Sequence, residues 1–232
     1  MKEYNYLIFD NRGSGKSGAP SKYSSKEMAK DIEELMNHLK WDKVHLVGIS
    51  MGGMISIEFA SMFPERLLSL ALVVTHAGSL APWRGIKTIT RTLFVKDHYT
   101  RGDLLVDILY SPEYLKKPSK TQPEKTNRDM FLEKYVFDCT NNQQPKLLGV
   151  YGHIKTVNTH SVSKERLLKI KDSAEKYQFP ISVITGTDDH LVKPKNSFYL
   201  NDILKPSEFL VLEGSGHSVN IENYDEFHQS IR

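Results

Sequence analysis

The sequence predicts an α/β fold in which helices flank a mostly parallel sheet, and three observations lead to this fold class. Apolar runs of strand length alternate with amphipathic segments of helical period, which is the pattern of βαβ units. The run at 67–75 is apolar almost throughout, as expected for a strand covered on both faces. The chain has 232 residues, of which 39% are hydrophobic and 25% are charged, an ordinary balance for a globular α/β domain.

The composition excludes several classes of protein. No apolar run approaches the roughly 18 residues of a spanning helix, so we expect no stable membrane insertion. A formal net charge of +3 is too small to indicate nucleic-acid binding. The single cysteine, Cys139, excludes an intrachain disulfide framework and, with no signal peptide in view, predicts a cytoplasmic protein. We expect neither a metal nor an organic cofactor, and the oligomeric state is left open.

The first elements follow in order along the chain. Residues 4–10 are predicted to form a buried strand that leads into a glycine-rich stretch at 11–20. A capping-box pattern at 24–27 predicts the start of a helix. Apolar residues at helical spacing mark the buried face of this helix: Met28, Ile32, Leu35, Met36 and Leu39. A second strand is predicted at 43–49, followed by a helix that Pro64 ends.

The later part of the chain adds two more predicted strands, at 181–185 and 208–212. Residues 78–178 contain no long apolar strand and carry 18 Lys and Arg against 11 Asp and Glu. We predict that they form a helical cap inserted into a core made of residues 1–77 and 179–232, and we interpret the basic excess as a solvated helical surface. Four aromatic residues of this cap fit either an apolar acyl or alcohol pocket or the cap's own core: Trp83, Phe94, Tyr99 and Phe131.

Two glycine motifs near the N-terminus resemble nucleotide-binding loops. Residues 13–18 formally satisfy G-x-G-x-x-G, and Gly15, Lys16 and Ser17 resemble the end of a P-loop. The helix that a dinucleotide site requires does not follow at once, and the position where a P-loop needs its first glycine is Asp10. We therefore interpret this segment as a glycine-rich turn.

A third glycine motif, G-x-S-x-G at 48–52, predicts a nucleophile. It lies between a predicted strand and a predicted helix, which is the context of a nucleophile elbow. Such a strained turn projects the Ser50 hydroxyl out of the sheet, and Gly48 and Gly52 leave room for it. The backbone N–H of Met51, at the start of the following helix, would donate to an oxyanion. The alternative is a glycine-rich turn with an incidental serine.

A serine nucleophile needs a histidine to take its proton and a carboxylate to orient that histidine. In this architecture both follow the serine, on loops at the carboxyl ends of later strands. His217 lies in a glycine-flanked loop after the last predicted strand, whereas Asp188 and Asp189 follow the strand before it and are not separated by the residues alone. His190 precedes the last strand and is a poor general base, and His45, inside a predicted buried strand, is interpreted as a core histidine.

With these residues in hand, the chain resembles the α/β-hydrolase superfamily over essentially its whole length. The segment 10–17 matches the family's D-x-R-G-x-G-x-S turn, Ser50 matches the elbow nucleophile and His217 matches the final glycine–histidine pair. The family's G-x-x-D-x-x-V segment, at 186–192, implies Asp189 as the acid. Among subgroups the chain is most similar to capped esterases, enol-lactonases and methylesterases.

The resemblance implies a serine hydrolase with a Ser50–His217–Asp189 triad that cleaves a small carboxylic ester, thioester or lactone. Family members normally have three strands ahead of the segment that matches 4–10, and a His-Gly loop that supplies a second oxyanion N–H. The sequence shows neither, so we expect an N-terminally incomplete fold and interpret the chain as a fragment. The alternatives are that the predicted strands at 4–10 and 43–49 pair directly with each other or that another chain fills the gap between them. The rival function is that of a truncated or non-catalytic protein of this fold.

Overall fold

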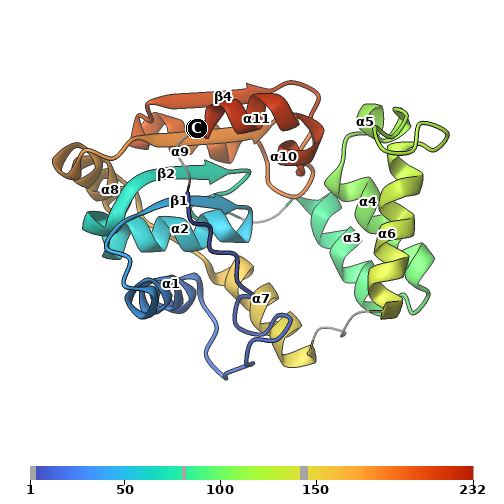
Figure 1. Ribbon diagram of the computed structural model, residues 1–232, viewed down its shortest axis with the longest axis horizontal. Coiled ribbons are helices and arrows are strands. Elements are labelled where there is room, and N and C mark those ends of the chain that lie inside the picture. The colour runs from blue at the N-terminus through green and yellow to red at the C-terminus, as the bar shows by residue number, and fades with distance from the viewer. Residues whose placement is uncertain (1–3, 80–81, 142–145, 232) are drawn as a thin grey trace.

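The computed structural model describes residues 4–79, 82–141 and 146–231. It places a four-stranded sheet among helices, with a separate group of helices beside this core (Figure 1). In chain order the elements are α1 (Ser25–Leu39), β1 (Val44–Ile49), α2 (Met51–Met62), the 3-10 turn η1 (Pro64–Arg66), β2 (Leu67–Val73), α3 (Trp83–Phe94), α4 (His98–Leu109), α5 (Pro112–Lys116), α6 (Asn127–Asn141), α7 (Leu147–Thr159), α8 (Lys164–Tyr177), β3 (Ile181–Gly186), α9 (Lys195–Leu204), β4 (Glu208–Leu212), α10 (Val219–Glu222) and α11 (Tyr224–Ser230).

The sheet has the order β1-β2-β3-β4, and every neighbouring pair is parallel. The last residue of β1, Ile49, is in register with Val73 at the end of β2, which is in register with Ile184 of β3. Because the strands are parallel and in register, their carboxyl ends lie along one edge of the sheet. The predicted fold class, a parallel sheet flanked by helices, is confirmed.

Helix α1 begins where its capping pattern predicts. The Ser24 hydroxyl accepts a hydrogen bond from the Glu27 backbone N–H at 3.1 Å, which satisfies one of the free donors of the first turn. Three of the predicted core residues are buried: Met28, Ile32 and Met36. Leu39, in the last turn, is exposed instead, because the helix ends there and Lys40 takes a left-handed cap with φ 59°.

One hydrophobic cluster joins α1, α2, α8 and α9 to strands β2 and β3. Phe59 of α2, Leu70 of β2 and Val183 of β3 are fully buried within it. Helix α8 falls inside the range predicted as a cap, yet its Leu167 and Ile170 belong to this core cluster. Helices α3 to α6 lie apart from the sheet (Figure 1), so the division of the chain into core and cap, with its boundaries, stays a prediction.

The prediction of a buried strand at 4–10 is wrong. The segment is not part of the sheet; the side chain of Ile8 is 95% exposed and that of Tyr6 is also exposed. A strand is stable only when a neighbour accepts and donates its backbone hydrogen bonds, and among the described residues β1 pairs with β2 alone. The two strands therefore do not close up directly. For the same reason β1 is an edge strand, so His45 is exposed and not a core histidine, with Nδ1 2.8 Å from Ser69 Oγ.

Candidate active site

Ser50 lies in the turn between β1 and α2. Its backbone has φ 56° and ψ −119°, a conformation that a non-glycine residue adopts only under strain. Two hydrogen bonds tie this turn to β2 and its end: the Ser50 N–H donates to the Val73 carbonyl at 2.9 Å, and the Thr75 hydroxyl donates to the Ser50 carbonyl at 2.8 Å. Both partners belong to β2 or its end, so the elbow is fixed from that side. The Ser50 carbonyl also accepts from the Gly53 N–H of α2 at 2.9 Å. Among the described residues, the Ser50 hydroxyl has no hydrogen-bond partner.

The glycines around Ser50 meet different surroundings. A Cβ at Gly48 would collide with the Ser56 hydroxyl and would lie 2.5 Å from the Gly52 carbonyl oxygen, so this position requires glycine. A Cβ at Gly52 would meet no described atom within 4 Å. A Cβ at Gly53 would lie 2.5 Å from Cβ of Thr75, so Gly53 lets α2 approach β2 closely. Sequence reasoning missed Gly53, whose only signal is its place after the motif.

His217 and Asp189 lie together at the carboxyl edge of the sheet. Asp189 follows β3 and His217 follows β4, both are buried, and His217 Nδ1 is 2.7 Å from Asp189 Oδ2. The other carboxylate oxygen, Oδ1, accepts hydrogen bonds from the backbone N–H groups of Leu191 and Val192 at 2.8 and 2.9 Å. Asp188 instead faces His190, whose Nε2 is 3.3 Å from it. The pairing leaves Nε2 as the His217 nitrogen that can exchange a proton.

The loop that carries His217 is held by a carboxylate that sequence reasoning missed. Glu222 Oε1 accepts hydrogen bonds from the backbone N–H groups of Gly216 and Ser111 at 3.0 and 2.9 Å, and Oε2 accepts one from the Ser111 hydroxyl at 2.6 Å. The Ser218 N–H also donates to the Leu109 carbonyl at 2.9 Å. Burial raises the pKa of Glu222. The His217 loop is therefore fastened to the segment between α4 and α5.

A pair of buried histidines lies beyond the end of β2. His76 Nδ1 accepts a hydrogen bond from the Gly78 N–H at 3.0 Å, and its ring centroid is 5.8 Å from that of His160. His160 Nδ1 is 2.8 Å from the Ser25 hydroxyl of α1. Burial lowers the pKa of His160 to about 4, with a further contribution from His76, and burial also lowers the pKa of His76. Both rings are therefore neutral at pH 7 and serve as packed polar groups.

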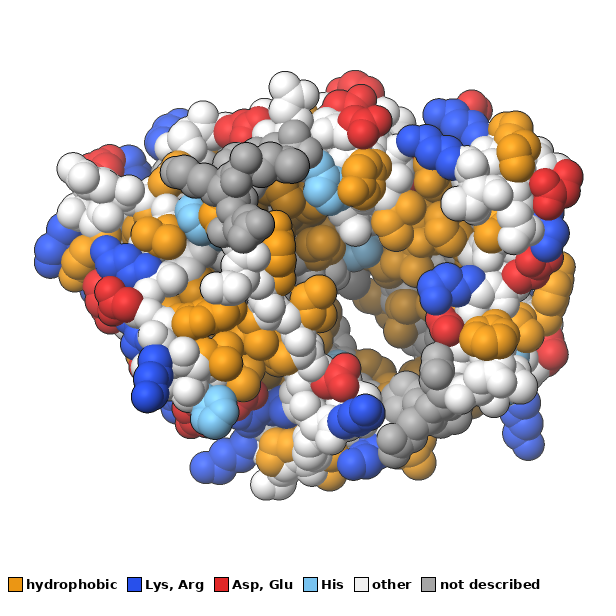
Figure 2. Space-filling model, viewed as in Figure 1, with side chains coloured by type: hydrophobic (Ala, Val, Ile, Leu, Met, Phe, Trp, Pro, Cys, Tyr) orange, Lys and Arg blue, Asp and Glu red, His pale blue; other side chains and the backbone are white. Residues whose placement is uncertain are grey.

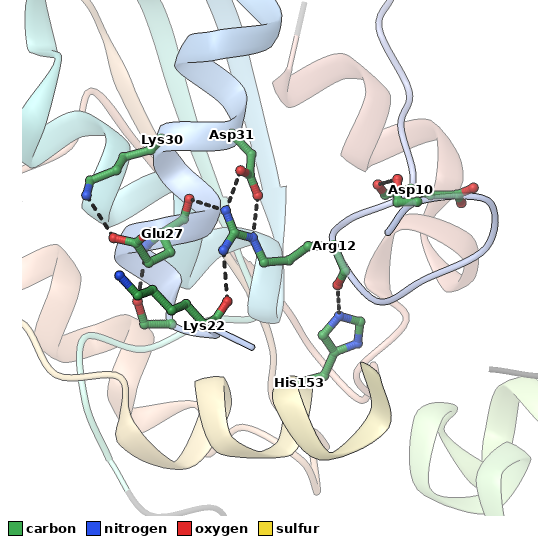
Figure 3. A network of polar contacts seen from close by, with 9 residues as sticks. Asp10, Arg12, Lys22, Glu27, Lys30, Asp31 and His153 are labelled. Carbon is green, nitrogen blue, oxygen red and sulfur yellow. Dashed lines mark hydrogen bonds and ion pairs between the residues drawn. The ribbon is translucent and has the colours of Figure 1, made fainter. Parts of the chain in front are cut away.

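The turn at 10–17 is fastened on two sides (Figure 3). The Arg12 guanidinium donates to both carboxylate oxygens of Asp31 in α1, with Nε at 2.7 Å, and also to the Lys22 carbonyl at 2.8 Å. His153 Nε2 in α7 is 2.8 Å from the Arg12 carbonyl oxygen. The pKa of Arg12 is raised by its hydrogen bond to Asp31. These contacts agree with the interpretation of this segment as a structural turn.

In the part of the chain that the structure describes, neither a cluster of metal ligands nor a membrane-spanning helix is found. Within residues 4–79, 82–141 and 146–231, no three His, Cys, Asp or Glu side chains are grouped so as to hold a metal ion. In the same ranges, no helix combines the length and the apolar character needed to cross a bilayer. Figure 2 shows the hollow between the core and helices α3 to α6, with hydrophobic side chains along its borders.

The fold, the elbow and the Asp189–His217 pair together define an α/β-hydrolase. The chain belongs to the alpha/beta hydrolase fold family, whose model matches residues 2–224. The resemblance found in the sequence is thereby confirmed.

Similar proteins include several hydrolases. A proline iminopeptidase of Lactobacillus helveticus is 25% identical over 236 residues, which cover 95% of this chain and 76% of that protein. Lipase 1 of Psychrobacter immobilis is 24% identical over 239 residues, which cover 97% of this chain and 67% of that protein. These relatives support hydrolytic activity.

Solved structures show the same fold. A thermophilic esterase from Thermogutta terrifontis has a TM-score of 0.71 at 22% identity, with 96% of this chain and 76% of the esterase covered. The enol-lactonase from Burkholderia xenovorans LB400 has a TM-score of 0.69 at 20% identity, with 96% of this chain and 77% of the lactonase covered. At these identities the likeness concerns the fold.

Proposed function

We propose that the protein is a serine hydrolase in which Ser50, His217 and Asp189 cleave a small carboxylic ester, thioester or lactone. The observation that carries the proposal is the 2.7 Å contact between His217 and Asp189 at the same sheet edge as the strained Ser50 turn. A buried carboxylate on Nδ1 fixes the imidazole tautomer and stabilises the imidazolium that forms when Nε2 takes a proton. A lipase among the relatives supports an ester as the substrate.

The proposed reaction has two halves. His217 Nε2 takes the proton of the Ser50 hydroxyl while Oγ bonds to the substrate carbonyl carbon, and the Met51 backbone N–H donates to the oxyanion. When the tetrahedral intermediate collapses, the leaving alcohol or thiol receives the proton from His217. Water, deprotonated by the same nitrogen, then attacks the acyl-enzyme and releases the acid and free Ser50.

A second candidate function, that of a binding protein with this fold but no catalysis, is favoured by one observation. A Cβ placed on Gly52 would meet no described atom within 4 Å, so the elbow is open at this position. The sequence shows no His-Gly loop to supply a second oxyanion donor, and an oxyanion held by one donor in place of two reduces turnover by about 10²–10³.

The location in the cytoplasm stays a prediction from cysteine content.

Labelling with a fluorophosphonate probe tests the proposed function. The wild-type chain should be labelled, and Ser50→Ala should abolish labelling while the circular dichroism spectrum stays unchanged. Ser56→Ala is the matched control, because its hydroxyl lies in the same helix and donates to the Gly52 carbonyl. A folded wild-type chain that the probe does not label would contradict catalysis and support the binding protein.

A further inference from the structure

Helix α3 leaves most of its large apolar side chains exposed to solvent. Its buried residues are Gly85 and Thr92. Four of its five large apolar side chains are exposed to solvent, by the following fractions: Trp83 76%, Ile86 40%, Leu93 54% and Phe94 80%. The fifth, Ile89, is half-buried. A surface helix of a globular protein normally buries its apolar face, and large contiguous apolar patches on a protein surface mark interaction sites.

The packed side of α3 is fixed by small residues. A Cβ at Gly85 would lie 3.0 Å from the His190 carbonyl oxygen and 3.2 Å from Cδ2 of Leu191, so a larger side chain fits between the helix and this loop only if the loop shifts. The Thr92 hydroxyl donates to the Ile89 carbonyl of its own helix at 2.7 Å. Rotation of the helix about its axis would drive a large side chain into the 190–191 loop. The exposure of the apolar residues therefore follows from the packing.

The exposed residues of α3 form one row along the helix. Trp83, Ile86, Leu93 and Phe94 fall at spacings of three, seven and one, which places them on one face. Arg84, Lys87 and Arg91 flank this row, and all three are exposed. The helix contains no acidic residue.

The positive charge of α3 is not compensated. Within the described residues, Arg84, Lys87 and Arg91 form no ion pair. By contrast, Arg128 of the neighbouring α6 is paired with Asp103 and Asp107 of α4 at 2.5 and 2.6 Å. An exposed apolar row beside unpaired cations is complementary to a surface that has an anionic outer layer over an apolar interior.

We propose that α3 docks on the surface of an anionic lipid bilayer. The apolar row, led by Trp83 and Phe94, would enter the boundary between headgroups and acyl chains while the basic side chains contact lipid phosphates. A helix of 12 residues is too short to span a bilayer and lies along its surface. Nucleic acid offers the negative charge but no apolar layer for the row, which favours lipid.

Docking would also orient the rest of the molecule. Gly85 contacts the loop that begins one residue after Asp189, so α3 borders the candidate active site. Figure 1 shows α3 on the side of the helical group that is nearest to the core. A bilayer held by α3 would therefore lie beside the hollow between core and helices. The docking itself does not depend on the proposed hydrolase function.

The fluorescence emission of Trp83 reports whether α3 enters a bilayer. The chain has two tryptophans, so Trp41→Phe leaves Trp83 as the single emitting residue. Vesicles of phosphatidylcholine and phosphatidylglycerol in a three-to-one ratio should shift its emission to shorter wavelength and carry the protein up in a flotation gradient. Vesicles of phosphatidylcholine alone should do so much more weakly, and high salt should weaken binding to the anionic vesicles.

Variants separate the apolar contribution to vesicle binding from the electrostatic one. Leu93→Ser with Phe94→Ser should weaken vesicle partitioning at least tenfold, because two large apolar side chains leave the interface. Lys87→Gln with Arg91→Gln should weaken it by roughly 25-fold on anionic vesicles, about fivefold for each basic side chain near the surface.

The matched control is Tyr199→Ser with Tyr224→Ser, two exposed aromatic residues on the core, which should leave partitioning unchanged. Circular dichroism and thermal melting check that every variant is folded. Absence of binding to anionic vesicles, or binding that the α3 variants leave unchanged, would overturn the proposal. So would a Trp83 emission shift that follows protein concentration without lipid, which would assign the face to a second copy of the chain.

Discussion

The two halves of the candidate active site are built differently. The acid–base half, which contains Asp189 and His217, is buried, and both carboxylate oxygens of Asp189 accept hydrogen bonds. The nucleophile half, around Ser50, sits at the end of the edge strand β1, and Gly52 faces open space. The acid–base half is enclosed by several elements, whereas the Ser50 turn takes its hydrogen bonds from β2, from the residues just after it and from its own helix α2.

This difference shows where each geometry comes from. The His217 loop receives hydrogen bonds from elements far apart in the chain, including the contact of Glu222 with Ser111. The strained backbone of Ser50 is held by Val73 and Thr75, both at the end of β2. We therefore expect changes in the acid–base half to alter the rate of catalysis. Changes to the residues that support Ser50 should alter mainly the free energy of unfolding.

The largest effect is expected from Asp189→Asn. An amide cannot hold His217 in the same tautomer, so kcat should fall by about 10⁴ while the melting temperature changes little. Asp188→Asn is the matched control, because that carboxylate faces His190, and it should retain activity. Ester hydrolysis rates of both variants decide the matter, and a greater loss in Asp188→Asn would reverse the assignment.

The buried histidine pair should make the nucleophile half sensitive to acid. The pKa of His160 is lowered from 6.5 to about 4 by burial first and by His76 second. A depressed pKa in the folded state gives stability that is present above pH 6.5 and is lost as pH falls through about 4. The loss amounts to about 3 kcal/mol.

Urea unfolding between pH 7 and pH 4 measures this loss. His160→Asn should flatten the pH dependence of the free energy of unfolding, whereas His38→Asn, at an exposed position in the last turn of α1, should keep it. Equal slopes in the wild type and His160→Asn would show that another group controls acid unfolding.

Glu222→Gln should weaken the hydrogen bonds that hold the His217 loop and should lower kcat moderately. The amide retains one acceptor but loses the charge-assisted part of the hydrogen bonds to Gly216 and Ser111, worth about 1.5 kcal/mol, so kcat should fall about tenfold. Because burial raises the pKa of Glu222, protonation of the carboxyl at low pH should mimic this loss in the wild type.

Glu213→Gln is the control for Glu222→Gln. Glu213 is exposed near the same loop and contacts the Thr187 hydroxyl at 3.2 Å. This variant should keep the wild-type kcat and its pH profile. If both glutamine variants behave alike, Glu222 has no special part in positioning His217.

The smallest expected effects distinguish two adjacent glycines. Gly53→Ala should lower the free energy of unfolding by about 1–2 kcal/mol, because its Cβ would overlap Thr75. Gly52→Ala should be neutral or stabilising by up to about 1 kcal/mol, since alanine favours the helix and no described atom lies nearby. Thermal melting of both variants is the measurement, and a larger loss for Gly52→Ala would show that its open side is covered in solution.

Much of the fold could be predicted because its signals are local. Apolar period and a capping serine predicted α1, and strand-length apolar runs predicted β1 to β4. The segment 4–10 has the same apolar character but is not a strand, because strand formation needs a neighbour that no local pattern specifies. Contacts such as Glu222 with Ser111 were beyond prediction, since they join residues 111 positions apart.

The sequence by itself determined the kinds of elements, their order and the residues that follow each strand. Since parallel strands end at one edge, that order was enough to place Ser50, Asp189 and His217 along the same edge of the sheet. Only the tertiary structure decided which surfaces are covered: the closed surroundings of His217, the open space at Gly52 and the exposed apolar row of α3. The physical reason is that a periodic pattern specifies which residues share a face, whereas packing specifies what that face meets.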